Sequence, residues 1–395
     1  MIDRLTLHNY KAFQHAEIPL GPLTLLTGLN SSGKSSVLQS LALLRQSHEA
    51  GDLEVAPLMS DARQAGLSTA VINQGFLLNG ELVSLGTGED VLHEDFTEDE
   101  PRIGLAVDEG PYHYGWTAAY EGEQNLLPLL DVELPRDAEG AATPTGPEAV
   151  RPAFLTAPFQ YLHADRISPA EFYPRDHHAA VGRGFLGVRG EHTVNFLRHH
   201  REDTVPQGPL RHPKAASDRL IDQAAAWMGD LCPGVDIQAD AIEGADAVRL
   251  SYGFQGTLGA TRRRRPSNVG FGLTYVLPIV VACLSARPGT LILLENPEAH
   301  LHPHGQTQMA TLTASAAAQG AQVIMESHSD HVINGVRLAV KRGLLAPAQA
   351  VFHYFRGDGT GVEIVSPHVD GDGMLDQWPT GFFDELENTL DQLIG

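Results

Sequence analysis

The chain of 395 residues has little cysteine, no excess of positive charge and no long hydrophobic run. Its cysteines, Cys232 and Cys283, lie far apart without metal-ligand spacing, which excludes a disulfide framework and fits a reducing, cytoplasmic compartment. The N-terminus lacks the apolar core of a signal peptide, and the run 276–284 is short and contains proline, so we expect no membrane anchor. The net charge of −22 means that nucleic acid would need a local basic patch.

The composition is that of a folded protein, with 42% hydrophobic and 19% charged residues. Alternating and buried patterns predict strands at 3–8, 14–19 and 23–27, a helix at 33–46, and short antiparallel strands within 83–92 and 103–120. After residue 291 strands and helices alternate, which predicts a largely parallel sheet with helices on its faces.

The strongest motif is a phosphate-binding loop. Residues 28–35, GLNSSGKS, match G-x-x-x-x-G-K-S/T between a predicted strand and a predicted helix. Backbone N–H groups in such a loop face the phosphates, Lys34 reaches the β and γ oxygens, and Ser35 binds Mg²⁺. The residues that we expect to bind ATP here are Gly28, Asn30, Ser31, Ser32, Gly33, Lys34, Ser35 and Ser36.

A second motif is the apolar strand LILLE at 291–295, which ends in a carboxylate. This is the form of a Walker B strand, which places an acid beside Mg²⁺. We predict that Glu295 acts on the metal ion through water.

The next residues, NPEAHLHP at 296–303, resemble the D-E-P-E-x-x-L-H-P run of RecF-, SMC- and OLD-like ABC ATPases. The resemblance covers residues 1–50 and 262–395. It implies an α/β ABC-ATPase head with a mixed, largely parallel core sheet flanked by helices and an antiparallel β subdomain. We expect a compact helical insertion from the helical spacing within 190–230.

The chain departs from the family pattern at Asn296, which stands where the family has its catalytic glutamate. An amide can orient water but cannot accept its proton. Glu298 is the nearest carboxylate that could act as the base, and the alternative is that it only supports the loop. Slow or partner-dependent hydrolysis is the resulting hypothesis.

Two further segments resemble family motifs that act on the γ-phosphate. SNVGFGL at 267–273 looks like a diverged signature motif, in which Ser267, Asn268, Gly270 and Gly272 contact the nucleotide of the opposite subunit. His328, after the strand at 323–326, matches the switch histidine, which contacts the γ-phosphate or the attacking water.

Several patterns keep two interpretations. Arg262–Arg265 can bind phosphate or form a solvated loop, and the default for 163–166 is a structural salt bridge. His300 and His302 lack a third metal ligand, Asp370 and Asp372 only superficially resemble a nuclease site, and Gln46 and Gln74 are candidates for the Q-loop glutamine.

We divide the chain into five predicted segments. Residues 1–134 and 261–345 form the ATPase head, 135–152 a flexible loop, 153–260 a helical insertion and lobe junction, and 346–395 a small C-terminal domain. Its segment 373–384 resembles a domain found on one branch of stand-alone prokaryotic ABC-type ATPases.

The resemblance implies an ATP- and Mg²⁺-dependent homodimer or higher oligomer that controls an effector. Similar ATPases accompany a nuclease in anti-phage systems such as Septu, so defence is the function it implies. The alternatives are a non-hydrolysing, nucleotide-dependent scaffold, which Asn296 favours, and a RecF-like DNA repair ATPase that uses the arginine run. A transporter fits least, because the segment LTLHNYKAF at 5–13 and the LHP run at 301–303 resemble the SMC and RecF side of the superfamily. No transmembrane segment is apparent either.

Overall fold

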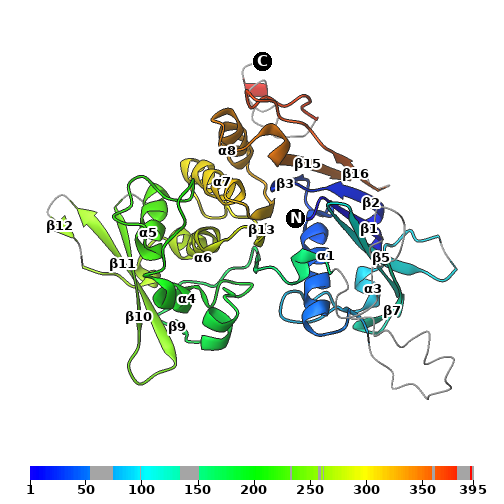
Figure 1. The fold of residues 1–395 in the computed structure, drawn as a ribbon, viewed down its shortest axis with the longest axis horizontal. Helices are drawn as coiled ribbons and strands as arrows, with labels where there is room; N and C mark the ends of the chain where they lie inside the picture. The colour runs from blue at the N-terminus through cyan, green and yellow to red at the C-terminus, as the bar shows by residue number, and fades with distance from the viewer. Residues whose placement is uncertain are drawn as a thin grey trace. The chain divides into compact units, whose positions relative to one another are not determined.

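The computed structural model divides the chain into two compact units, which we call unit 1 and unit 2 (Figure 1). Unit 1 contains Met1–Gly21, Leu29–Ala157 and Phe355–Ile364, and unit 2 contains 22–28, 158–354 and 365–395. The chain therefore passes from one unit to the other just after Gly28, inside the phosphate-loop motif. The structure describes residues 1–53, 74–97, 99–133, 151–231, 234–256, 259–260, 262–357, 361–379 and 392–393.

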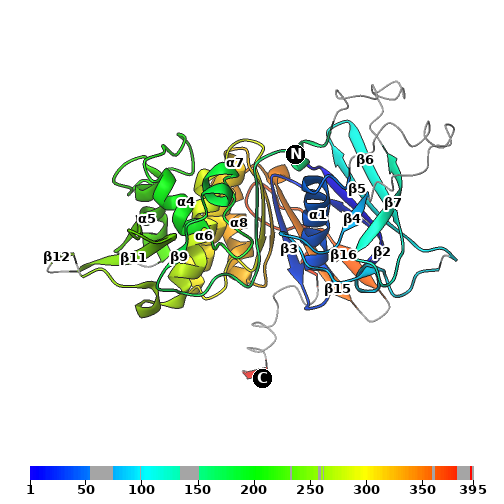
Figure 2. The same cartoon turned by 90° about the horizontal axis from the view of Figure 1, so that it is seen from below.

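Unit 1 is built on an antiparallel sheet with the strand order β2-β1-β5-β6-β7-β4. Along β5 every second side chain is buried, as the period of two requires when one face covers the core. The helix α1 (Lys34–Glu49) packs against β4 and stands beside these strands in Figure 2. The strands are β1 (Arg4–Tyr10), β2 (Phe13–Pro19), β4 (Gly75–Leu77), β5 (Arg102–Glu109), β6 (Tyr112–Ala119) and β7 (Leu126–Glu133).

Unit 2 contains the predicted parallel sheet. β3 (Leu23–Gly28) pairs with β14 (Gln322–Glu326), β14 with β13 (Leu291–Glu295), and β13 with β8 (Phe159–Leu162), all in parallel. In the strand order β15 (Ala350–Gly357) follows β3, and β16 (Val362–Val365) follows β15; of these two strands, 350–354 and 365 belong to unit 2 and the other residues to unit 1. The central strands are almost wholly buried, which is why they read as continuous apolar runs.

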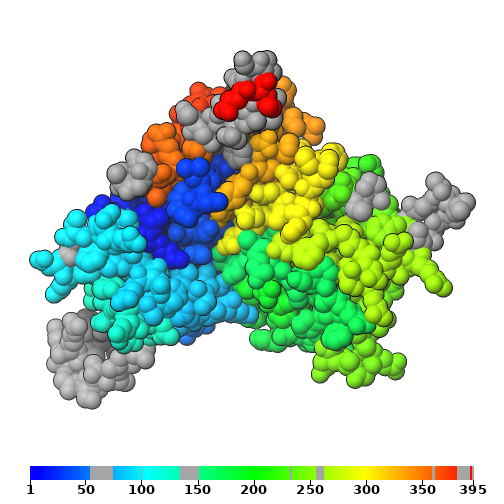
Figure 3. Space-filling view, turned by 180° about the vertical axis from the view of Figure 1, so that it is seen from behind, coloured from blue at the N-terminus to red at the C-terminus, as the bar shows by residue number. Residues whose placement is uncertain are grey.

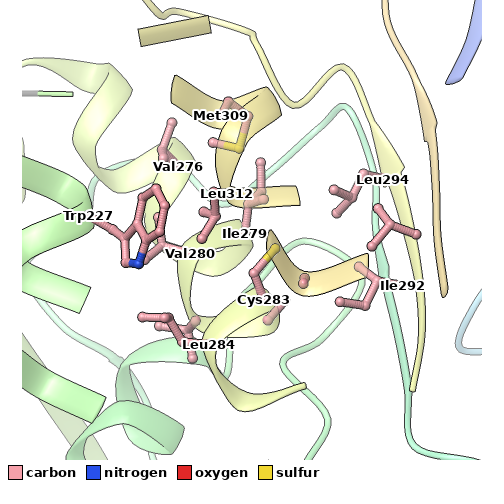
Figure 4. Packing of buried hydrophobic residues seen from close by; sticks show 14 of the residues in the cluster. Trp227, Val276, Ile279, Val280, Cys283, Leu284, Ile292, Leu294, Met309 and Leu312 are labelled. Atoms are coloured by element: carbon pink, nitrogen blue, oxygen red, sulfur yellow. The ribbon is translucent and has the colours of Figure 1, made fainter. Parts of the chain in front are cut away.

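The core of unit 2 surrounds α6 (Phe271–Ser285), whose residues 273–284 are all buried. A helix that is apolar on every side must be enclosed on every side. Trp227 and Met309 from neighbouring helices and Ile292 from β13 pack around Ile279 and its neighbours (Figure 4). The other helices are α4 (Thr193–His200), α5 (Leu220–Leu231), α7 (Pro303–Ala318) and α8 (Asp330–Lys341). From behind, the green and yellow residues of this unit form one continuous surface (Figure 3).

The predicted helical insertion needs a correction. Residues 190–230 contain most of α4 and α5 as expected, but 153–260 also contributes β8 and a separate antiparallel sheet. In β10 the residues Val235, Ile237 and Ala239 are buried in alternation, a period of two that the sequence analysis did not use. This sheet consists of β9 (Tyr173–Pro174), β10 (Val235–Ala241), β11 (Ala247–Gly256) and β12 (Gly259–Ala260).

The strand predicted within 83–92 is also wrong. Residues Gly88–Val91 form the short helix α3, which begins with a capping box between Thr87 and Asp90. The Asp90 carboxylate accepts the Thr87 N–H at 2.7 Å and thereby stabilises the first helical turn. The strands within 103–120 are confirmed as β5 and β6.

Two other expectations concern the loop at 135–152 and the membrane anchor. The loop predicted at 135–152 lies outside the described residues except for its last two. Among the helices of the described ranges, each is too short or too polar to cross a bilayer.

Truncation of Ile279 tests the core around α6. Its side chain is 0% exposed, so Ile279→Ala should lower the free energy of unfolding by about 2–5 kcal/mol through lost burial and a cavity. Leu338→Ala, at a side chain that is 38% exposed on α8, is the control and should change it by no more than about 0.5 kcal/mol. Urea denaturation followed by circular dichroism measures both. Equal losses would contradict the assignment of this core.

Candidate functional site

The phosphate-loop motif takes the backbone conformations that its glycines allow. Gly28 has φ 134°, Ser31 φ 61° and Gly33 φ 91°, and α1 begins at the next residue, Lys34. A Cβ at Gly33 would lie 2.6 Å from Phe13 Cζ, in addition to the strained φ. Glycine is therefore required at this position by both backbone conformation and space.

The turn between β1 and β2 supports this loop within unit 1. Ala12 Cβ would come within 2.9 Å of a Cβ at Gly33, and Phe13 packs edge-on against Phe355 with ring centroids 6.2 Å apart. Sequence reasoning used the segment YKAF at 10–13 only as a family resemblance. Its role in holding the loop was missed, because the contact joins residues 20 positions apart.

The polar atoms of the loop form a local network. Lys34 Nζ donates to Leu29 O at 2.5 Å and lies 3.5 Å from Ser32 Oγ, which itself donates to Leu29 O at 2.7 Å. Asn30 and Ser31 are exposed, whereas Ser36 is buried in the first turn of α1. The helix N-terminus, a lysine and exposed loop residues make an arrangement that can bind a polyphosphate.

In unit 2, Glu295, the predicted Walker B acid, accepts hydrogen bonds at both of its carboxylate oxygens. The Tyr161 hydroxyl donates to Glu295 Oε1 at 2.5 Å, and Ala164 N–H donates to Oε2 at 3.0 Å. Glu295 is also in register with Glu326 at the end of the neighbouring strand β14. Two acidic residues thus end neighbouring strands at the same end of the parallel sheet, and the sequence analysis assigned no role to the second.

Arg166 holds the turn that follows Glu295. Its guanidinium donates to Glu295 O at 2.8 Å, to Asn296 O at 2.7 Å and to His163 O at 2.9 Å, and stacks on the Tyr275 ring at 4.6 Å. Burial lowers the pKa of Arg166 to about 10, so that the side chain stays charged at neutral pH. The structural salt bridge expected within residues 163–166 does not involve Arg166, because the hydrogen bonds of Arg166 go to backbone carbonyls. Asp165 pairs with Arg189 instead, at 3.2 Å.

The predicted catalytic residues Glu298 and His328 lie together. Glu298 Oε1 accepts the His328 backbone N–H at 2.8 Å, and His328 Nε2 lies 3.6 Å from Glu326 Oε1. Asn296 has φ 44°, a left-handed conformation that asparagine tolerates. The structure thus brings Asn296, Glu298 and His328 into one turn region beside Glu295.

Two buried oxygens in this region fit a role toward water or a metal ion. Glu298 Oε2 and Asn296 Oδ1 are buried and have no hydrogen-bond partner among the described residues. An orphaned buried polar atom is unfavourable unless a ligand or water satisfies it. Carboxylate and amide oxygens are ligands that Mg²⁺ prefers, and they also accept hydrogen bonds from water bound to the metal ion.

The predicted signature motif lies at the start of α6. Asn268, Gly270 and Gly272 line a pocket of ≈ 500 Å³ together with His300 and His302, whereas Ser267 is exposed and is not one of its lining residues. A Cβ at Gly272 would lie 2.8 Å from His300 O, so glycine allows the two segments to approach. His300 stacks against Phe271 and Tyr275, with centroids 5.0 and 4.8 Å apart.

Other candidates have structural partners. The buried Gln46 amide bonds Leu77 O, Leu82 N and Val83 N, which leaves it no role as a mobile Q-loop residue. Asp370 Oδ1 accepts the N–H groups of Asp372 and Met374 and closes a turn. No group of three or more potential metal ligands occurs in the part of the chain that the structure describes.

Comparison with protein families finds three matches along the chain. Residues 1–96 match a family described as an AAA ATPase domain. Residues 146–334 match an AAA domain family that its description links to the AbiEii toxin of type IV toxin–antitoxin systems. The chain carries an AAA-type ATPase domain. Residues 345–393 match a protein family of unknown function, DUF3696, and no protein with a curated description matches the chain.

Solved structures similar to this ATPase chain include heads of SMC proteins. An SMC head bound to the C-terminal winged-helix domain of ScpA is 13% identical, covers 92% of this chain and 97% of its own, and has a TM-score of 0.49. The SMC head domain from Thermotoga maritima is 12% identical, with coverages of 92% and 98% and a TM-score of 0.44. A Pyrococcus furiosus-derived complex of an SMC head with ScpA is 12% identical, with coverages of 100% and 99% and a TM-score of 0.48.

Removal of the Tyr161 hydroxyl tests how Glu295 is held. Tyr161→Phe should raise the Mg²⁺ concentration for half-maximal phosphate release about tenfold, because the carboxylate loses the hydrogen bond that orients it. The free energy of unfolding should fall by only about 1 kcal/mol. Tyr112→Phe, in the antiparallel sheet of unit 1, is the matched control. An unchanged Mg²⁺ dependence would mean that Glu295 does not act on the metal ion.

Proposed function

We propose that this ATPase binds ATP with Mg²⁺ at its phosphate loop and forms head-to-head dimers around the nucleotide. The observation that carries the proposal is the left-handed turn at Ser31 and Gly33 that leads directly into α1, with Lys34 folded across the loop. Backbone N–H groups at a helix N-terminus favour the phosphates, and Lys34 adds a positive charge. Two copies of the chain then give two equivalent nucleotide sites.

The residues assigned to the metal ion are Ser35 and Glu295, and the motif pattern alone supports this pairing. Mg²⁺, when bound, neutralises charge on the transferred phosphate. Ser35 supplies a hydroxyl at the start of α1, and Glu295 supplies a carboxylate whose orientation Tyr161 and Ala164 maintain. Both groups are oxygen donors, as Mg²⁺ prefers.

Hydrolysis is proposed to be slow, with Glu298 as the general base. Asn296 carries an amide and cannot take a proton. Glu298 has one buried oxygen without a hydrogen-bond partner among the residues that the structure describes, and its other oxygen accepts the His328 N–H. His328, 38% exposed and 3.6 Å from Glu326, is the residue that we propose contacts the γ-phosphate or the water. The same Asn296 supports the second candidate, a nucleotide-dependent scaffold that does not hydrolyse ATP.

The dimer is proposed to control an effector protein, such as a nuclease in anti-phage defence. The resemblance to Septu-like ATPases and the match to an AbiEii-linked family support this role. A RecF-like role in DNA repair has less support from the arginine run. Arg263 pairs with Asp236 at 2.5 Å and Arg265 with Glu171 at 2.6 Å, which neutralises half of the patch.

Loss of Lys34 tests nucleotide binding and assembly. Lys34→Ala should weaken ATP binding at least about tenfold, through the lost contact to the β and γ oxygens, and abolish the ATP-driven rise in mass. Calorimetry and light scattering with ATP and Mg²⁺ measure the two effects. Lys214→Ala, at a side chain that is 79% exposed, is the charge-matched control. If the mass of the wild-type protein does not change when ATP is added, the nucleotide-gated dimer is excluded.

Replacement of Glu298 separates the ATPase from the scaffold. Glu298→Gln should reduce phosphate release about 100-fold or more while ATP-dependent dimers persist, because the base is lost but the phosphate contacts remain. Glu202→Gln, 58% exposed on the surface, should have no effect. Release that is equally low in the wild type and in Glu298→Gln, even with a partner present, would favour the scaffold.

A further inference from the structure

The pocket at the start of α6 contains a positive side chain outside the predicted motifs. Arg264 lines it together with Gly270 and Gly272 of the predicted signature motif and with His300 and His302. Its backbone is fixed by an antiparallel bridge, in which Arg264 N–H donates to Tyr252 O at 2.8 Å and Tyr252 N–H donates to Arg264 O at 2.9 Å. The position of this side chain is therefore set by the rim of the β10–β11 sheet.

The arginine run alternates in direction, as extended backbone requires. Arg263 and Arg265, on either side of the bridge residue, are ion-paired with Asp236 and Glu171. Arg264, between them, faces the pocket and has no ion pair within the described ranges. Of these three successive arginines, the structure leaves only the middle one with its charge directed to a pocket.

The chemistry of the pocket suits an anion. None of the described residues that line it carries a carboxylate, although the whole chain has a net charge of −22. Besides Arg264 the lining offers the Asn268 amide, the imidazoles of His300 and His302, and glycines that let a ligand reach the backbone. A guanidinium presents paired donors that match two phosphate oxygens, which a lysine ammonium cannot do.

We propose that Arg264 contacts the terminal phosphate of the ATP bound to the phosphate loop of a second copy of the chain. The inference rests on the proposed head-to-head dimer and adds a residue that distinguishes ATP from ADP in that dimer. ADP lacks the phosphate that the guanidinium would bind, so the pocket would remain an unpaired positive site. The symmetric dimer contains this contact twice, so its effect on assembly is doubled.

The first test compares assembly and nucleotide binding in variants of the full chain. Arg264→Ala should weaken ATP-driven dimerisation at least about tenfold, since hydrogen bonds to charged groups are lost at both sites. Binding of ATP to the dilute monomer should stay within about twofold of the wild type, which also shows that the variant is folded. Arg264→Lys should be intermediate, because it keeps the charge and loses the paired donors. Arg263→Ala and Arg265→Ala are matched controls and should assemble as the wild type does.

The second test decides which copy supplies the arginine. Arg264→Ala and Lys34→Ala are each defective alone, but a mixture should recover ATP-driven dimers and part of the phosphate release. The mixed dimer has one site in which an intact phosphate loop meets an intact Arg264. If Arg264 acted on the nucleotide of its own chain, no site in the mixture would be complete and nothing would be recovered.

The outcomes separate this inference from the function on which it rests. Wild-type protein that does not assemble with ATP would overturn both. Wild-type assembly that Arg264→Ala leaves unchanged, or a defect that mixing with Lys34→Ala does not relieve, would overturn only the role of Arg264 in the second copy.

Discussion

The arrangement of acids in unit 2 depends on one buried guanidinium. Arg166 is 1% exposed and donates to the carbonyl oxygens of Glu295 and Asn296, where the chain leaves β13 in a left-handed turn. A buried charge is stable only when hydrogen bonds replace water, and here backbone carbonyls and the Tyr275 ring do so. With Arg166 in place, Glu295, Asn296 and Glu298 keep fixed positions relative to one another.

The acidic residues of the chain are unevenly placed: one edge of the parallel sheet carries two of them, whereas the residues that line the pocket at the start of α6 include none. Glu295 and Glu326 are in register at the ends of neighbouring parallel strands, so two acidic residues lie at one edge of the sheet. A few residues further on, His300 packs onto Phe271 and Tyr275 at the start of α6, where the lining residues carry amide, imidazole and guanidinium groups. The net charge of the whole chain therefore does not predict the charge at the sheet edge or in the pocket.

Much of the local structure could be predicted from the sequence. The glycines and lysine of residues 28–35 and the apolar strands 291–295 and 323–326 are local patterns, and the structure has these elements. The matched ATPase families cover the same segments. The helix at Gly88–Val91 and the strand β10 were missed. The sequence analysis followed the composition of these segments and did not use the capping box of Thr87 and Asp90 or the short alternation in β10.

The sequence by itself determined the motif types, their order and the chemical groups available, including the amide at Asn296, since these depend on residues close together in the chain. Only the tertiary structure decided which groups meet. Arg166 reaches Glu295 across about 130 positions, Phe13 packs on Gly33, and Arg264 rather than its neighbours faces the pocket. These pairings arise from strand register and burial, which are properties of the packed chain and leave no mark in local spacing.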